Sequence, residues 1–312
     1  MNFPVLKTEE GEVIRPQNVM LHNQEKQMIF SDAQDPSKLF NFDLESGKIV
    51  EEFRAEKKGN AKSDVSNLVH ITNKERNGQT QSEQTFVGIN ERAIYTLDPR
   101  INKKEKAAES KVYKTNPLFN KVATTINGGL AIGSLNGCIR LYKQVGQNAK
   151  TLLPGLGDPI RAIEMSVDGK WILATTQTYL LLLSTSCKGE KNGFEASMGK
   201  EKPVPVKLQL NVKDLAKHQI KSLDFTAAHF NNFSHSNKYH TGIVTSTGPF
   251  VVTWNLQRVL KGLRNQYQII KVKEQQKLVD SQFQFDNDEN ILVTESKNLG
   301  VQTRSKKVFI NY

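Results

Sequence analysis

The sequence predicts an all-β fold, a β-propeller with six recognisable four-stranded blades and room for a seventh. A strand–turn–strand scheme recurs along the chain, and its closing strands fall at regular intervals. These strands centre on Phe42, Leu97, Tyr142, Leu183, Trp254 and Thr303. The intervals are 55, 45, 41, 71 and 49 residues, which bracket the 40–50 residues expected for one propeller blade.

The stretch "IRAIEMSVDGKWILATTQTYLLLL" (160–183) shows the scheme most clearly. Its apolar run from Trp171 to Leu183 has thirteen residues, fewer than the roughly 20 that a helix needs to cross a bilayer. Four polar residues, "TTQT" (175–178), split this run into two strand-length pieces. Asp168-Gly169 is a hairpin signal because both residues tolerate positive φ. We therefore expect three antiparallel strands here and no membrane segment.

The same scheme recurs elsewhere. It is found in "MIFSDAQDPSKLFNFD" (28–43), "EQTFVGINERAIYTLD" (83–98), "KVATTINGGLAIGSLNGCIRLY" (121–142), "GIVTSTGPFVVTWN" (242–255) and "FQFDNDENILVTESKNLGVQTR" (283–304). A fourth strand is predicted after some of the closing strands, in "GKIVEEF" (47–53), "VKLQLNV" (206–212) and "YQIIKVK" (267–273). Helix is expected only as single turns, at 214–219 and 255–262.

Twenty-four strands in one open sheet would leave long exposed edges, whereas separate blades packed in a ring leave only short ones. A pair of β-sandwich domains is the structural alternative. We expect one propeller domain over residues 19–312, with a polar inserted loop at 184–206. Residues 1–18 are interpreted as an N-terminal segment that closes the ring, or as the remnant of a seventh blade.

Composition gives the broad class of protein. The 312 residues include 37% hydrophobic and 24% charged side chains, which is typical of a globular protein. Cys138 and Cys187 have no partner at metal-ligand spacing, which fits a reducing compartment. The N-terminus lacks a secretory signal pattern. We therefore expect a soluble cytoplasmic protein without a transmembrane segment.

A formal net charge of +11 is spread over lysine-rich loops. Such loops are usually solvated surface. The alternative is that they bind an acidic polymer or an anionic membrane.

Motifs for enzymatic chemistry are missing from the sequence. There is no phosphate-binding G-x-x-x-x-G-K-[ST] loop and no G-x-S-x-G elbow. His229, His235 and His240, with His218 upstream, are spaced unlike the tighter pairs of zinc sites. We predict no enzyme activity, no metal and no cofactor.

Two segments, "GGLAIGSLNGCIRLY" (128–142) and "IRAIEMSVDGKWILAT" (160–175), resemble WD-repeat half-blades, although the terminal Trp-Asp pair is nowhere intact. The chain more specifically resembles the C-terminal propeller domain of the vacuolar import and degradation family (the member numbered twenty-seven) and its plant "defective embryo and meristems" relatives. Matching stretches include "PSKLFNFDLESGKIVEEF" (36–53), "EQTFVGINERAIYTLDPR" (83–100) and "NAKTLLPGLGDPIRAIEMSVDGKWILATTQTYLLLL" (148–183). The resemblance implies a WD-repeat-like cytoplasmic protein linked to vacuolar protein turnover. Family members usually carry a longer N-terminal region, with a pleckstrin-like domain.

The predicted function is a non-catalytic scaffold for protein–protein interaction. In a propeller, the turns between middle strands share one face with the connections between blades, and loops on a rigid scaffold often carry binding residues. The candidate partner-binding residues on that face are Asn90, Glu91, Asp158, Arg161, Gln177 and Thr247. The alternative role for Asp158 and Arg161 is to cap a turn or to pair with each other.

Overall fold

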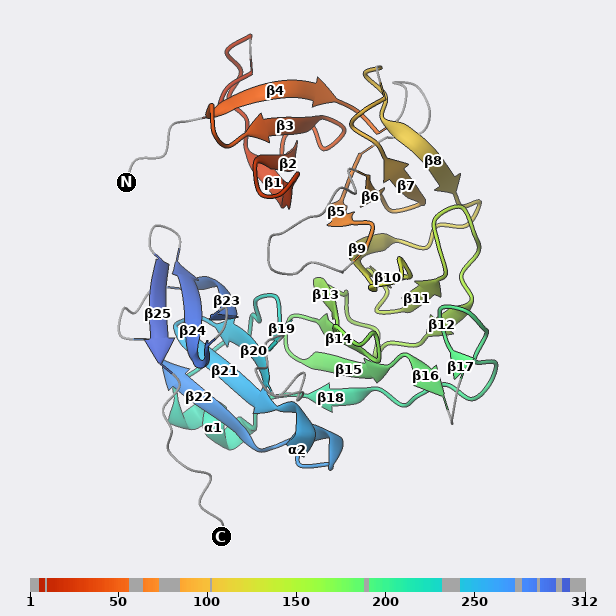
Figure 1. Cartoon of the computed structure of the whole chain (residues 1–312). Coiled ribbons are helices and arrows are strands. Elements are labelled where there is room, and N and C mark those ends of the chain that lie inside the picture. The colour runs from red at the N-terminus through yellow and green to blue at the C-terminus, as the bar shows by residue number, and fades with distance from the viewer. Residues whose placement is uncertain are drawn as a thin grey trace.

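The computed structural model describes residues 6–8, 10–55, 64–72, 85–101, 103–187, 191–231, 242–272, 277–284, 287–295 and 299–303. Strands dominate these residues, and they form six main sheets that follow one another around a common centre in chain order (Figure 1). The predicted all-β propeller with six recognisable blades is confirmed. We number the sheets blade 1 to blade 6.

Five blades have four described strands and the sixth has three. Blades 1 and 2 comprise β1 (Pro16–His22), β2 (Gln27–Asp32), β3 (Leu39–Asp43), β4 (Lys48–Phe53), β5 (Asn67–His70), β6 (Phe86–Ile89), β7 (Ala93–Leu97) and β8 (Ala107–Val112). Blades 3 and 4 comprise β9 (Phe119–Thr124), β10 (Leu130–Ser134), β11 (Ile139–Tyr142), β12 (Thr151–Leu153), β13 (Ala162–Met165), β14 (Trp171–Thr175), β15 (Leu180–Ser184) and β18 (Val206–Leu208). Blades 5 and 6 comprise β19 (His229–Phe230), β20 (Gly242–Thr247), β21 (Phe250–Asn255), β22 (Tyr267–Lys271), β23 (Leu278–Gln284), β24 (Asn287–Glu295) and β25 (Leu299–Thr303).

The turn chemistry predicted from the sequence forms these hairpins. Gly169 adopts a φ of 68° between β13 and β14, and the Asp168 carboxylate accepts hydrogen bonds from Ser166 Oγ and Lys170 N. Because glycine has no Cβ, this left-handed conformation is not strained. Residues 176–179 then turn the chain from β14 into β15. Three antiparallel strands over residues 162–184 are confirmed.

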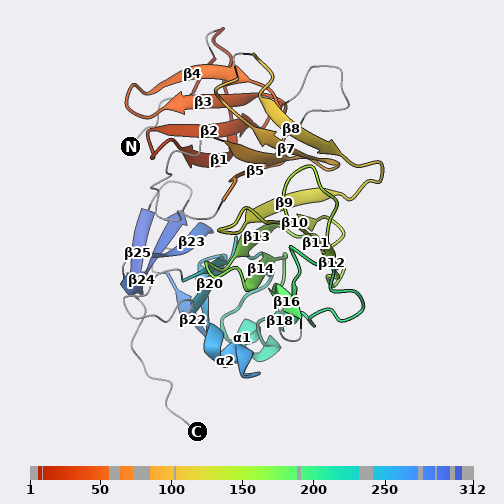
Figure 2. The ribbon, with the colours of Figure 1, turned by 45° about the vertical axis from the view of Figure 1, so that its right-hand side comes forward.

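The hydrophobic core is divided among the interfaces between neighbouring blades. Alternation along each strand sends successive side chains to opposite faces of the blade. In β2, for example, Ile29 packs in the cluster shared by blades 1 and 2, whereas Phe30 packs on the other face of blade 1. Figure 2 shows blades 1 and 2 lying one against the other. Similar clusters join blades 2 and 3, 3 and 4, 4 and 5, and 5 and 6.

The described residues 6–14 form a small hairpin on blade 1. Lys7 and Val13 make an isolated antiparallel bridge, and Leu6 and Ile14 pack with Phe30 and Phe40. This hairpin covers the face of blade 1 that turns away from blade 2. The boundary of a closing segment at residue 18 remains a prediction.

The inserted loop of blade 4 is only partly polar. It contains the two-stranded sheet β16 (Ser186–Cys187) and β17 (Lys191–Asn192). Beyond this sheet, Phe194 and Met198 are buried in the cluster between blades 3 and 4. The insertion therefore contributes to the core and is anchored by it.

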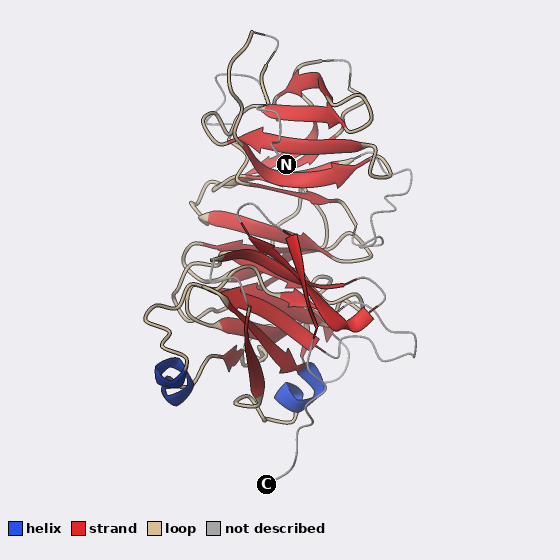
Figure 3. Ribbon diagram, turned by 90° about the vertical axis from the view of Figure 1, so that its left-hand side faces the viewer, coloured by secondary structure: helices blue, strands red, loops and turns tan. Residues whose placement is uncertain are grey.

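Two short helices, α1 (Val212–Lys217) and α2 (Leu256–Leu260), are found close to the single turns predicted from the sequence. Both lie at the same end of the molecule (Figure 3). Asn255 caps α2, since its Oδ1 accepts a hydrogen bond from Arg258 N. No helix among the described residues is long and apolar enough to cross a membrane.

Candidate functional site

The chain alternates between two faces of the ring. We call the connection face the side that carries the turn between the second and third strands of each blade and the connection from each blade to the next. The six candidate residues lie in or beside these turns and connections. The structure separates them into two places on this face, with Asp158 beside the second.

Asn90 and Glu91 lie in the β6–β7 turn of blade 2. Asn90 Oδ1 accepts hydrogen bonds from Arg92 N (2.9 Å) and Ala93 N (2.6 Å). Its Nδ2 donates to the Tyr95 hydroxyl at 2.9 Å. The Glu91 carbonyl accepts a hydrogen bond from Phe119 N of blade 3, and its side chain is exposed. Asn90 therefore fixes the turn, while the Glu91 carboxylate remains available at the surface.

These two residues line a pocket of about 620 Å³, which we call the mouth pocket. It lies where the inner parts of blades 1, 2 and 3 meet on the connection face. Blade 1 contributes Gln17 and Asn18 from its innermost strand β1, and blade 3 contributes Asn120 and Lys121 from β9. Lys121 was not among the candidates from the sequence. The burial of this side chain lowers the pKa of its ammonium group.

Arg161, Gln177 and Thr247 gather on the connection that leads from blade 4 to blade 5. The Arg161 guanidinium donates to Asp224 Oδ1 at 2.6 Å, and Thr247 Oγ1 accepts from Asp224 N at 3.1 Å. The Gln177 carbonyl accepts from Phe225 N at 2.9 Å. Arg161 thus pairs with Asp224, which the sequence analysis did not identify.

The same Asp224 carboxylate also accepts a hydrogen bond from Lys277, with 2.7 Å between Nζ and Oδ2. The Lys277 and Arg161 donors lower the pKa of Asp224. Arg161 and Lys277 border a second hollow, of about 540 Å³, with the exposed Val279 at its edge. These contacts link blades 4, 5 and 6, and they leave the charges of Arg161 and Lys277 partly neutralised.

Asp158 lies beside the turn that carries Gln177. It lies in the connection between blades 3 and 4, and its side chain is exposed. It is close to Tyr179, the pKa of which is raised to about 12 by burial and by the neighbouring Asp158 carboxylate. The ion pair of Arg161 is therefore with Asp224 and not with Asp158.

A larger hollow of about 690 Å³ lies on the opposite face, over blades 2, 3 and 4. Its polar side chains are largely turn residues. Asn192 Oδ1 accepts from Phe194 N, and Asp168 is bonded within its own turn. Since these groups hold the local backbone, their oxygen atoms are already engaged as acceptors.

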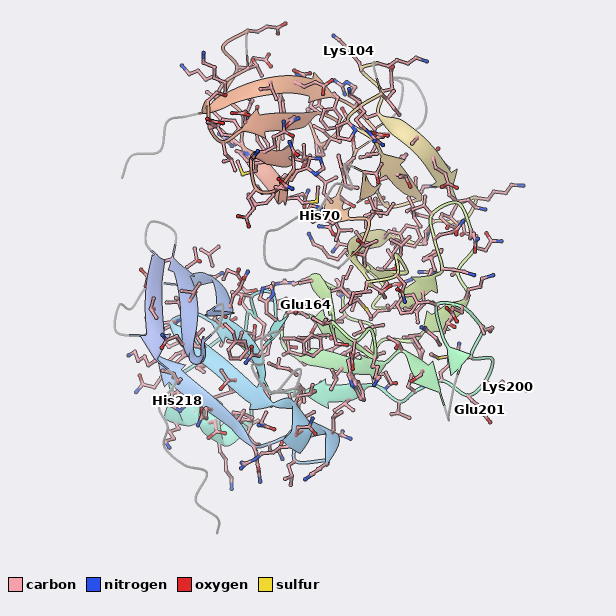
Figure 4. The ribbon with its side chains drawn as sticks, in the orientation of Figure 1. His70, Lys104, Glu164, Lys200, Glu201 and His218 are labelled. Carbon is pink, nitrogen blue, oxygen red and sulfur yellow. The ribbon has the colours of Figure 1, made fainter. Side chains whose placement is uncertain are left out.

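An ionisable cluster joins the innermost strands of blades 4, 5 and 6. His229 Nδ1 lies 2.6 Å from Glu164 Oε2, and His229 Nε2 lies 3.3 Å from Asp280 Oδ1. Although burial lowers the pKa of His229, the two carboxylates outweigh this effect and raise it to about 10. Figure 4 shows Glu164 on the inner side of the ring and His218 at its periphery.

This arrangement brings His229 together with carboxylates. His235 and His240 lie outside the described residues, and no group of His, Cys, Asp and Glu side chains in the described part of the chain is arranged to hold a metal ion. The sequence feature that could have indicated this cluster is Glu164, a charged residue in the strand "AIEM". Its partners, however, are 65 or more residues away in the chain. Strand periodicity cannot predict such a pairing.

Comparison with known proteins places the chain in a family. Residues 2–310 match the VID27 C-terminal WD40-like domain. The chain belongs to this family. Vacuolar import and degradation protein 27 of Schizosaccharomyces pombe is 36% identical over 297 residues, and the Saccharomyces cerevisiae protein of the same name is 33% identical over 294 residues. These alignments cover 92% and 91% of this chain but 36% of each relative.

Solved structures are similar in fold at low sequence identity. The C-terminal WD40 domain of Sif2 has a TM-score of 0.58 and 12% identity, covering 91% of this chain and 67% of that one. The computationally designed Ika8 protein has a TM-score of 0.57 and 10% identity, covering 96% and 74% of the two chains. KlHsv2, with its loop 6CD replaced by a Gly-Ser linker, has a TM-score of 0.51 and 11% identity, covering 90% and 76%. The VID27 domain therefore has a WD40-like propeller fold.

Proposed function

We propose that this propeller is a non-catalytic scaffold that binds proteins through its connection face. The observation that carries the proposal is the presence of exposed apolar side chains on this face, two on firmly held turns and two beside its hollows. Leu135 and Leu156 are 37% and 54% exposed. Val112 borders the mouth pocket and Val279 borders the second hollow.

Leu135 and Leu156 lie on two adjoining turns that are held firmly in place. Leu135 N donates to the Leu118 carbonyl at 2.9 Å. A Cβ added at Gly155 would lie 1.9 Å from the Gly137 carbonyl oxygen, so the two backbones are in close contact. Single exposed apolar residues are common on protein surfaces. A pair on a pre-organised backbone favours binding because little conformational entropy is lost on association.

The names of the relatives connect the family with vacuolar import and degradation. We propose that the scaffold acts in this process by holding protein partners, and that it works in the cytoplasm. The rival function is electrostatic binding of an acidic polymer or an anionic membrane, which the net charge of +11 favours. Lysines such as Lys104 and Lys200 lie at the outer rim of the ring (Figure 4).

Affinity capture from the native cell extract tests the proposal at about 0.05 M and about 0.3 M salt, since exposed charge contacts weaken over that range. The bait is compared with the variants L156D and L44D. Leu44 is 42% exposed on the opposite face and serves as the matched control.

We expect a reproducible set of proteins that is retained at both salts, lost from L156D and kept by L44D. Capture dominated by nucleic acid, lipid or acidic tails and lost at the higher salt would favour the electrostatic function. Equal retention by both variants would place the interface elsewhere than on the connection face.

A further inference from the structure

We propose that the mouth pocket accepts one carboxylate side chain, an Asp or Glu of a bound protein segment, on the ammonium group of Lys121. This inference rests on the proposed protein-binding function and specifies the chemistry of the partner at one position. It is carried by a half-buried lysine at the wall of a pocket, for which the described residues supply no acceptor.

Lys121 is held on a rigid part of the ring. It lies in β9, the innermost strand of blade 3, opposite Gly133 of β10. The next residue, Val122, donates its backbone N–H to Asn67 Oδ1 of the neighbouring innermost strand β5 at 3.0 Å. The backbone that carries Lys121 is thus fixed on both sides.

Among the described residues, no oxygen atom takes a hydrogen bond or ion pair from Lys121 Nζ. Burial without such a partner disfavours a charged group, and the pKa of Lys121 is lowered by this effect. A ligand that supplies a negative charge would relieve the penalty. Binding of an anion to this ammonium group is therefore favoured.

Lys106 shows how the same fold treats a buried lysine with a structural role. Its side chain is 3% exposed, and Nζ lies 2.5 Å from Glu51 Oε1. The ammonium group also donates to the carbonyls of Pro99 at 2.9 Å and Ile101 at 2.7 Å. Lys121 has no comparable set of described acceptors, so its position is not explained by support of the fold.

The Asn and Ser side-chain donors that line the pocket are already engaged with the framework. Asn18 Nδ2 donates to Ser31 Oγ at 3.1 Å, and Asn120 Nδ2 donates to the Ile160 carbonyl at 2.7 Å. Ser66 Oγ donates to the Ile89 carbonyl. An anion entering the pocket would therefore meet two charged donors, Lys121 and Arg92. Arg92 is exposed and its guanidinium donates to the Tyr113 carbonyl at 3.4 Å, whereas Lys121 is half-buried.

The charges around the pocket favour one carboxylate over a more highly charged group. Lys121 and Arg92 are balanced by Asp64 and Glu91. A phosphate dianion or a nucleic acid backbone brings more negative charge towards the two acidic side chains than a single carboxylate does, so the carboxylate is repelled less. Val112 adds an apolar wall that suits the neighbouring side chains of a protein segment.

The test uses a displayed library of random 12-residue peptides, selected on the full chain. We expect the enriched peptides to share an Asp or Glu at one aligned position. They should bind at least tenfold more weakly to K121M, because a hydrogen bond between two charged groups contributes more than a neutral one. K114M is the matched control, since Lys114 is exposed on the same face and does not line the pocket.

A second arm leaves the protein unchanged. The acidic residue of a selected peptide is replaced by its amide, and the peptide is titrated against the wild type and K121M. If the carboxylate contacts Lys121, the amide peptide loses about tenfold against the wild type and almost nothing against K121M. Thermal unfolding of K121M checks that the fold is retained.

Three results would overturn the inference: no peptide enriched, enriched peptides without an aligned acidic residue, or equal losses for K121M and K114M. The capture experiment remains independent of these results. Proteins held through Leu156 at both salts, combined with peptides indifferent to Lys121, would leave the scaffold function standing and remove the carboxylate site. If capture fails while acidic peptides bind Lys121, the carboxylate site would stand and the scaffold function would be removed.

Discussion

Glu164 and His229 join two neighbouring blades near the centre of the ring, with 2.6 Å between Oε2 and Nδ1. The other oxygen of Glu164 accepts the backbone N–H of Phe230 at 2.8 Å. Asp280 approaches the far side of the same imidazole from blade 6. One protonated histidine thus holds two carboxylates from the blades on either side.

Replacement of His229 by glutamine should destabilise the ring. The H229Q variant removes the positive charge that His229 supplies to the carboxylate of Glu164, a side chain that is 12% exposed. Removing one partner of a buried ion pair lowers the free energy of unfolding by about 3 kcal/mol. Urea unfolding should show this loss. Adding E164Q to H229Q should recover part of it, and a double variant that is less stable than H229Q alone would contradict the account.

Alkaline pH should weaken the same contact. The pKa of His229 is raised to about 10 in the folded state, against roughly 6.5 in the unfolded chain. The folded chain therefore holds a proton that the unfolded chain releases. This stabilisation is complete below pH 6.5 and is lost as the pH rises towards 10. Between pH 7 and 9, the free energy of unfolding of the wild type should fall more steeply than that of H229Q, by roughly 1 kcal/mol per pH unit. Parallel profiles would exclude the effect.

Acid should act through His22, which has the opposite shift. Burial, and to a lesser extent the neighbouring His70, lower the pKa of His22 to about 4. The unfolded chain takes up a proton near pH 6.5 that the folded chain refuses, so stability is complete above pH 6.5 and falls as the pH drops towards 4. The total loss is at most about 3 kcal/mol.

The H22F variant keeps a ring beside Phe86 and cannot be protonated. Its thermal midpoint should fall less than that of the wild type between pH 7 and pH 5. H218F is the control at the periphery of the ring, and it should follow the wild type. If H22F loses as much thermal stability in acid as the wild type does, groups other than His22 cause the loss.

Gly242 should be required for the packing of blade 5 on blade 6. A Cβ at this position would lie 2.8 Å from Cζ of Phe283, a side chain that is 7% exposed in the cluster between these blades. The G242A variant should lose about 1–3 kcal/mol of stability through overpacking. F283L removes the end of the ring, so the two changes together should cost less than the sum of their separate effects. Additive losses in a double-mutant cycle would show that this contact is not responsible.

The sequence was sufficient to predict the blades because each one depends on local signals. Alternating apolar residues and turn residues such as Asp168-Gly169 specify a hairpin within about twenty residues. Their recurrence at 41 to 71 residues indicated the ring. The loop 184–206 was predicted as polar, whereas the structure buries Phe194 and Met198 from it. Two apolar residues in a polar segment carry no periodicity that would reveal this burial.

The candidate face could be predicted in the same way, since topology alone decides which turns share a side of a propeller. The sequence could not decide which residues meet there. Arg161 forms an ion pair with Asp224, which lies 63 residues later in the chain, and not with Asp158. Lys121 gains its significance from a pocket built by three blades. Local periodicity determines strands and turns, whereas contacts between blades depend on the register and closure of the whole ring, which only the tertiary structure fixes.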